Sequence, residues 1–280
     1  MKLFVTGGTG FVGSHFINAA HRAGHDIVAL RRPGSQPRVT LEREPAWVDG
    51  PLDGDYRAAM QGCEVFVHLA SHTPNPPYDT LVNCLHWNVQ ASIGLAEQAR
   101  DEGITQFLVA GSCFEYGRSA QRYSFIPVTA PLEPTLSYPT SKAAASIAFQ
   151  GFAAQYKVQL KILRIFQVYG EGEQANRLWP ALRTAAQAGA NFPMTQGAQL
   201  RDFIDVKDVA AAFVHGLDFS QTPPGEPIIS HVASGKPQTL LEFATHWWQA
   251  WGGTGTLQPG AVEYRFNEIM RLVPEVSKTA

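Results

Sequence analysis

The chain has 280 residues, of which 45% are hydrophobic and 16% are charged, with a formal net charge of −2. Charged residues are scarcer than the ~25% of an average soluble protein, which indicates a large buried core rather than a disordered chain. A near-neutral balance without blocks of like charge argues against nucleic acid or an anionic membrane surface as a partner.

No apolar run approaches the ~18 residues that could span a bilayer, and the apolar start of the sequence is too short for a secretion signal. The cysteines Cys63, Cys84 and Cys113 are odd in number and lack the spacing of metal ligands. We therefore expect free thiols, no metal site and a cytoplasmic protein that binds neither membrane nor nucleic acid.

Short apolar runs typical of buried parallel strands alternate with longer helix-like segments. Strands are predicted at residues 2–6, 26–30, 65–70, 106–111 and 161–166, and helices at 13–23, 55–61, 87–102 and 140–156. This alternation indicates an α/β fold, a doubly wound parallel sheet with helices on both faces. It weakens after residue 166. We therefore expect a first domain over residues 1–166 and a smaller C-terminal α+β substrate lobe over 167–280, with segments near 201–217 packing back on the first domain.

Three glycines at three-residue spacing, Gly7, Gly10 and Gly13, join the first predicted strand to the first helix. Without Cβ atoms they permit a tight turn, let backbone amides approach a pyrophosphate and allow close helix packing, while the helix N-terminus adds partial positive charge. The pattern predicts a Rossmann dinucleotide site. The other loop residues expected to contact the cofactor are Thr9, Phe11 and Val12.

The second predicted strand runs into Arg31 and Arg32, where enzymes that use NAD usually carry an acidic residue for the ribose 2′-hydroxyl. A guanidinium fork suits a 2′-phosphate instead, so these arginines favour NADP(H), with NAD(H) as the alternative. The competing interpretation is that both are solvated side chains at a strand end.

Tyr138 and Lys142 form the one Tyr-x-x-x-Lys of the sequence. Residues four apart share a helix face, so the Lys142 ammonium should lie near the Tyr138 phenol and lower its pKa from about 10. Such a phenol exchanges a proton with a substrate oxygen while a hydride moves at the attached carbon. Ser112, after the fourth predicted strand, would meet the same oxygen. The pattern predicts Ser112, Tyr138 and Lys142 as the catalytic group.

Further motifs are spread over nearly the whole chain: TGGTGFVG (6–13), HLAS (68–71), Asn88, GSCFEYG (111–117), YPTSK (138–142), LRIFQVYG (163–170) and RDFIDVKDVA (201–210). In this order they resemble the extended short-chain dehydrogenases/reductases, most closely the sugar-nucleotide epimerase/dehydratase/reductase branch. The resemblance implies the same catalytic group. It also implies cofactor contacts by Leu52, Leu69, Ala70, Ser71, Asn88, Tyr138, Lys142 and Ile165, and substrate contacts by Thr73, Ser112, Gln167, Arg177, Leu178, Arg201 and Arg265.

Arg201 and Arg265 would hold the diphosphate of a nucleotide-sugar substrate through bidentate bonds, although each could instead form a structural ion pair. Gln167 stands where the family usually has Asn, so a contact between Gln167 and the substrate is left open. Helices 87–102 and 140–156 are the pair with which the family commonly forms homodimers, through a four-helix bundle.

Cys113 and Phe114 stand where 4,6-dehydratases carry an Asp-Glu pair, which argues against dehydration. The Cys and His of enzymes that make GDP-fucose are also not matched. The prediction that remains is an NADPH-dependent reductase of a nucleotide-diphosphate 4-keto-(deoxy)sugar, with hydride added to C4 and Tyr138 as proton donor. The alternatives are an NAD-dependent nucleotide-sugar 4-epimerase, a reductase of hydrophobic ketones, and an NADP-binding redox-sensing regulator without catalysis.

Overall fold

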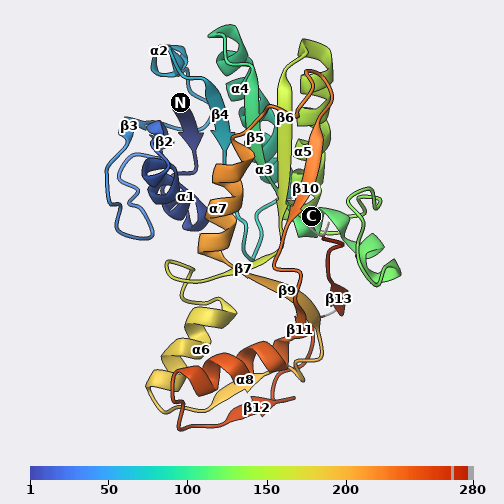
Figure 1. The fold of residues 1–280 in the computed structure, drawn as a ribbon. Coiled ribbons are helices and arrows are strands. Elements are labelled where there is room, and N and C mark those ends of the chain that lie inside the picture. The colour runs from blue at the N-terminus through green and yellow to red at the C-terminus, as the bar shows by residue number, and fades with distance from the viewer. Residues whose placement is uncertain (266–267, 277–280) are drawn as a thin grey trace.

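The computed structural model describes residues 1–265 and 268–276. Its main body is a seven-stranded parallel sheet with strand order β10-β6-β5-β4-β1-β2-β3 (Figure 1). The strands are β1 (Lys2–Thr6), β2 (Asp26–Arg31), β3 (Ala46–Asp49), β4 (Val65–His68), β5 (Gln106–Ser112), β6 (Gln159–Ile165) and β10 (Ile228–Val232). The arrangement confirms the predicted doubly wound α/β fold of Rossmann type.

Helices cover both faces of this sheet because successive strand residues point to opposite sides. Leu3 and Val5 of β1 face one core, in which Phe16 of α1 and Phe213 of α7 meet with ring centroids 6.3 Å apart. Phe4, between them in sequence, faces the other core, against α4 and α5. The helical elements around the sheet are α1 (Phe11–Arg22), α2 (Arg57–Met60), α3 (Leu81–Leu85), the π-helical η1 (His86–Ala91), α4 (Ser92–Asp101), the 3-10 turns η2 (Cys113–Tyr116) and η3 (Arg118–Arg122), α5 (Ser137–Tyr156) and α7 (Val206–Gly216).

A smaller body lies beyond the carboxyl ends of the main strands, as Figure 1 shows. A small mixed sheet and a separate strand pair are joined here by two helices with an aromatic core that includes Trp179, Phe203, Phe243 and Trp247. The elements are β7 (Gln167–Tyr169), α6 (Leu178–Gln187), β8 (Phe192–Met194), β9 (Leu200–Asp205), β11 (Pro237–Thr239), α8 (Leu240–Ala250), β12 (Leu257–Pro259) and β13 (Arg271–Leu272).

Two strands of the main sheet, β3 and β10, were not expected from the sequence. Each lies at an edge of the sheet, where one side has no strand partner, and most of their residues are only half-buried or exposed. Short edge strands of this kind lack the continuous apolar run that marks a central parallel strand. Because β10 pairs with β6, the chain returns to the seven-stranded sheet at residues 228–232, after it has already entered the small body at β7. Among the described residues, no helix combines the length and apolarity needed to cross a membrane.

Candidate active site

The glycine loop is packed so tightly that side chains would not fit in it. A Cβ on Gly13 would lie 2.0 Å from the carbonyl oxygen of Gly7, and a Cβ on Gly7, where φ is +76°, would lie 2.5 Å from the amide of Ala70. Gly10 donates its N–H to Gly7 O at 2.9 Å and occupies the N-cap of α1, where it has no side chain to cover the first helical N–H groups. A bare helix N-terminus beside a Cβ-free turn is the cradle that a dinucleotide pyrophosphate requires.

The end of β4 places Leu69, Ala70 and Ser71 against this cradle, since Gly7 touches the backbone of the first two. Asn88 keeps the segment after them in position: its Oδ1 accepts the His72 N–H at 2.7 Å, and its Nδ2 donates to Ser141 Oγ of α5 at 2.9 Å. Asn88 lies on the π-helical turn η1, a type of irregularity that often occurs at functional sites. Its amide therefore links the β4 loop to the helix that carries Tyr138.

The structure places Ser112 beside the Tyr138 phenol, with Lys142 one helical turn after Tyr138. Ser112 ends β5, whereas Tyr138 and Lys142 lie on the first turns of α5, and all three side chains are buried. Burial raises the pKa of the Tyr138 phenol, while Ser71 and Ser112, which lie beside it, act to lower that pKa. The phenol therefore keeps its proton at neutral pH in this arrangement.

The pKa of Tyr138 is raised by burial and not lowered, contrary to what the sequence analysis expected from Lys142. The Lys142 Nζ donates to the carbonyl oxygen of Ala110 on β5 at 2.8 Å, and burial lowers the pKa of Lys142. Burial removes both groups from water. The free energy needed to bury a phenolate exceeds the stabilisation that the Lys142 ammonium gives it, so the pKa of Tyr138 rises.

The two arginines expected to select NADP(H) have different surroundings. Arg31 donates from Nε to Asp49 Oδ1 of β3 at 2.8 Å, and its guanidinium lies 4.8 Å from the ring centroid of Trp47. Arg31 is therefore held by an ion pair, which neither the NADP(H) interpretation nor the solvated strand end anticipated. Arg32 is exposed at the start of a turn whose Ser35 Oγ approaches Thr9 Oγ1 of the glycine loop at 3.4 Å, so Arg32 remains beside the cradle.

On the substrate side, Tyr78 has its ring centroid 5.4 Å from that of Tyr138. Burial raises the pKa of Tyr78, and the positive charges of Arg177 and Arg265 act against that rise, which places both arginines near the phenol. The loop that carries Tyr78 also meets the small body, where Asn75 Nδ2 donates to Gln174 Oε1 at 2.5 Å. Of the residues near Tyr78 in this loop, the sequence predicts Thr73 as a substrate contact.

Arg177 and Arg201 differ in how firmly a carboxylate holds them. Arg201 is buried and donates to Glu268 Oε1 at 2.9 Å and to Ile269 O. Arg177 Nε lies 3.4 Å from Glu173, whose pKa burial raises to about 7. Glu173 is therefore partly protonated at neutral pH, which leaves the positive charge of Arg177 incompletely neutralised and available to another anion.

The remaining predicted contacts fall at element ends near these groups. Ile165 ends β6, opposite Ser112, Gln167 begins β7 and Leu178 begins α6. Thr73 accepts the Asp79 N–H at 3.4 Å, which ties it to its own loop. Leu52 follows β3 and packs partly against the sheet core.

Known proteins identify the family. A family model described as the NAD dependent epimerase/dehydratase family matches residues 3–229. The chain belongs to this family. Membership confirms the resemblance to extended short-chain dehydrogenases/reductases and makes the chain an NAD(P)-dependent enzyme.

Relatives within the epimerase/dehydratase family carry out different reactions. A UDP-glucose 4-epimerase of Corynebacterium glutamicum is 25% identical over 262 residues, with 84% of this chain and 76% of that protein covered. A dTDP-4-dehydro-6-deoxy-D-allose reductase of a Streptomyces species is also 25% identical, with 86% of this chain and 78% of that protein covered. A solved UDP-glucose 4-epimerase of Thermotoga maritima, bound to UDP-glucose, has a TM-score of 0.86 at 18% identity over 99% of this chain and 91% of that chain.

We predict that Gly13→Ala weakens dinucleotide binding by about tenfold or more, because overpacking costs about 1–3 kcal/mol and the loop must shift. Titration calorimetry with NAD and NADP would measure this. Gly94→Ala is the matched control, because Gly94 lies within α4 and a Cβ there would meet nothing within 4 Å. Unchanged affinity in a folded Gly13→Ala protein would show that the loop is not the binding site.

Proposed function

We propose that this chain transfers a hydride at C4 of a sugar carried on a nucleoside diphosphate, and that it works as an NADPH-dependent reductase of the 4-keto sugar. The observation that carries the proposal is the buried Tyr138 phenol beside Ser112, at the same edge of the sheet as the dinucleotide cradle. A phenol that keeps its proton suits a donor to the oxygen of a ketone under reduction. The names of the relatives support a nucleotide sugar, because the named epimerases and reductase all act on one.

The bound nicotinamide cofactor supplies the hydride. The Ser112 hydroxyl donates a hydrogen bond to the C4 oxygen and fixes its position. Tyr138 transfers its proton to the same oxygen as negative charge develops there, so the carbonyl becomes a hydroxyl and Tyr138 becomes a phenolate. The nearby Lys142 ammonium stabilises that phenolate until solvent returns the proton.

Arg177 and Arg265 support recognition of the diphosphate, since both lie near Tyr78 and neither is held by a strong carboxylate bond among the described residues. Arg201 would add a third cation from deeper in the site, where Glu268 holds its orientation. Two or three guanidinium groups around one diphosphate give charge-assisted, bidentate bonds.

An NAD-dependent 4-epimerase is the second candidate, favoured by the Arg31–Asp49 ion pair. That pair leaves Arg32 as the arginine beside the cradle that is free for a 2′-phosphate, which weakens the argument for NADP(H). An epimerase would use Ser112, Tyr138 and Lys142 as well, with Tyr138 first accepting the proton of the C4 hydroxyl.

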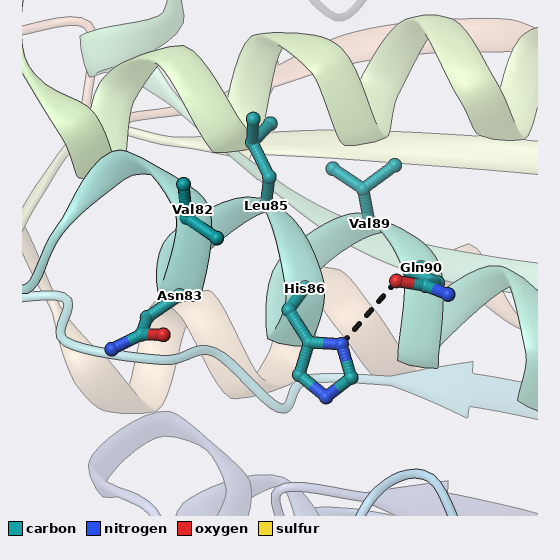
Figure 2. A pocket seen from close by; sticks show the side chains of 6 residues that line it. All are labelled: Val82, Asn83, Leu85, His86, Val89 and Gln90. Atoms are coloured by element: carbon teal, nitrogen blue, oxygen red, sulfur yellow. Dashed lines mark hydrogen bonds between the residues drawn. The ribbon is translucent and has the colours of Figure 1, made fainter.

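We further propose that the chain forms a homodimer through the outer face of α3, η1 and α5. Val82 is 75% exposed and Ile147 is 61% exposed, with Leu81 also at the surface. Figure 2 shows the hollow along α3 and η1, lined by Val82, Asn83, Leu85, His86, Val89 and Gln90. A second copy, with its own helices, presents apolar groups of the same kind, which makes the contact self-complementary.

We predict that Tyr138→Phe lowers the turnover of nucleotide 4-keto sugars by about 10²–10⁴-fold, because the proton donor is lost. Cofactor affinity should stay within a few-fold of the original, as fluorescence titration would show. Tyr156→Phe, at the far end of the same helix, is the control. Equal turnover by both variants would contradict the role of Tyr138, and no turnover by any form with tight NADPH binding would favour a regulator.

For the cofactor, we predict that Arg32→Ala weakens NADPH binding by about tenfold, since a hydrogen bond between charged groups contributes about 1.5–3 kcal/mol. Arg31→Ala should change it less, because Asp49 already occupies Arg31. Mass spectrometry of the dinucleotide released on denaturation gives an independent measurement. Stoichiometric NAD would instead favour the epimerase, which retains and recycles its cofactor.

For the dimer, we predict that Val82→Glu produces a monomer in sedimentation experiments, because a carboxylate would be desolvated in the contact. Val262→Glu, at an exposed valine in the small body, is the matched control and should remain dimeric. A monomeric parent protein would contradict this proposal and leave the catalytic one intact.

A further inference from the structure

A buried carboxylate, Glu115, lies directly behind the end of β5. It has no exposed surface, and its Oε1 accepts the backbone N–H of Ser112 at 2.7 Å. Its Oε2 accepts bonds from Ser146 Oγ of α5 at 2.8 Å and from Arg164 Nε of β6 at 2.9 Å. One carboxylate therefore connects the strand that ends in Ser112, the helix that carries Tyr138 and Lys142, and the neighbouring strand.

The bonds of Glu115 lie next to those of Lys142 in both elements: Ser112 is two residues from Ala110 on β5, and Ser146 is one turn from Lys142 on α5. Lys142 is 5% exposed, and its ammonium donates to Ala110 O, a neutral acceptor. Burial lowers the pKa of Lys142, and Glu115 is the group whose charge acts to raise it. Gly111 leaves the space for this arrangement, because a Cβ there would lie 3.0 Å from Glu115 Oε1 and 2.8 Å from Arg164 Cγ.

We propose that Glu115 is a positioning residue of the active site, which fixes the Ser112 backbone and provides the buried counter-charge for Lys142. It touches neither substrate nor cofactor in this role. It acts through Ser112 and Lys142, so its contribution to turnover rests on the function proposed above, whereas its effect on Lys142 does not.

The other titratable groups around Lys142 are uncharged, so Glu115 is the group that can balance the Lys142 ammonium. His68 of β4 faces Lys142, but burial lowers its pKa to about 3, so it is neutral and bonded to Thr6 Oγ1. Tyr138, on the helix of Lys142 itself, keeps its proton because burial raises its pKa. A neutral imidazole and a neutral phenol cannot balance an ammonium.

On the far side of Glu115, Arg164 bonds the Tyr116 hydroxyl at 2.8 Å, and that hydroxyl meets His231 Nε2 at 2.5 Å. Burial lowers the pKa of His231 and raises that of Tyr116, so both stay neutral. Burial also raises the pKa of the Cys113 thiol, which is therefore uncharged. The charges in this part of the described structure are thus those of Glu115, Arg164 and Lys142, with Arg201 acting on Cys113 from the substrate side.

The test is a direct titration of Lys142 in the purified full chain, by NMR of protein labelled with ¹³C at lysine Cε and assigned with Lys142→Met. Glu115→Gln keeps the size of the side chain and removes its charge, and we expect it to lower the pKa of Lys142. The double variant Glu115→Met/Arg164→Met removes both buried charges. Apolar replacement of a buried ion pair is often neutral or stabilising, so this protein should fold even where Glu115→Gln does not.

Glu133→Gln is the matched control, because Glu133 is also paired with an arginine, Arg122 at 2.6 Å, but lies at the surface. Its Lys142 titration should match that of the parent. In assays of turnover, loss of Glu115 should lower kcat by about 10²-fold through misplacement of Ser112, and should move the basic limb of the kcat–pH profile to lower pH.

An unchanged Lys142 titration in folded Glu115→Gln, or the same Lys142 pKa in the double variant as in Arg164→Met, would overturn the proposal. Because that titration needs no substrate, it remains decisive even if nucleotide 4-keto sugars prove not to be turned over. A lower Lys142 pKa without turnover would therefore support the role of Glu115 and contradict only the proposed reaction.

Discussion

Backbone contacts at the end of β1 determine where everything else on the functional edge of the sheet can lie. The Gly7 backbone touches Leu69 and Ala70 after β4 on one side and Gly13 of α1 on the other, at distances that exclude a Cβ. Since β4, β5 and β6 follow β1 in register across the sheet, this contact fixes the line along which their carboxyl ends emerge. Ser112 then lies beside Ile165, and α5 packs over β5 and β6 with Tyr138 at its first turn. The cradle and the residues predicted to be catalytic are thus parts of one edge of the sheet.

Several charged side chains are buried behind that edge. Burial of each one destabilises the fold unless a partner compensates the loss of hydration. Arg164 and Glu115 balance one another at 2.9 Å, and Tyr116, Val128 and Ser146 satisfy further donors and acceptors of the pair. Lys142 adds a third charge with only a carbonyl as its direct partner. Such an arrangement persists where the surrounding packing enforces it, and here residues of the sheet, α5, η2 and the loop at Val128 surround it.

Sequence alone was sufficient for features that depend on local pattern. The central strands and the glycine loop follow from apolar runs and residue spacing. Ser112 lies beside Tyr138 because the end of β5 and the first turn of α5 bring them together. The family model bears out the fold and the enzyme class. The roles of the individual site residues remain predictions.

Features that depend on long-range contacts were not predictable in this way. The partner of Arg31 is Asp49, on a strand too short and too exposed to recognise from its four residues. The pKa of Tyr138 depends on burial, which the Tyr-x-x-x-Lys spacing does not report. Glu115 did leave a local signal, since Ser112-Cys113-Phe114-Glu115 has the S-x-x-E pattern of a capping box, and both bonds of that box are present. Its contact with Arg164, 49 positions away in sequence, could not be read from that pattern.

The return of the chain to the main sheet has a mechanical consequence. The polypeptide passes from the sheet into the small body at Gln167, comes back at Val206 to form α7, pairs β10 with β6, and leaves again after Val232. Two domains joined by a single linker can rotate about that linker. Here several connecting segments pass between the two bodies, and together they restrict such a rotation. Opening for ligand exchange should then fall to the loops at the seam, such as the one in which Asn75 reaches Gln174. Selection could reshape those loops for a new ligand without disturbing the sheet edge that carries the glycine loop.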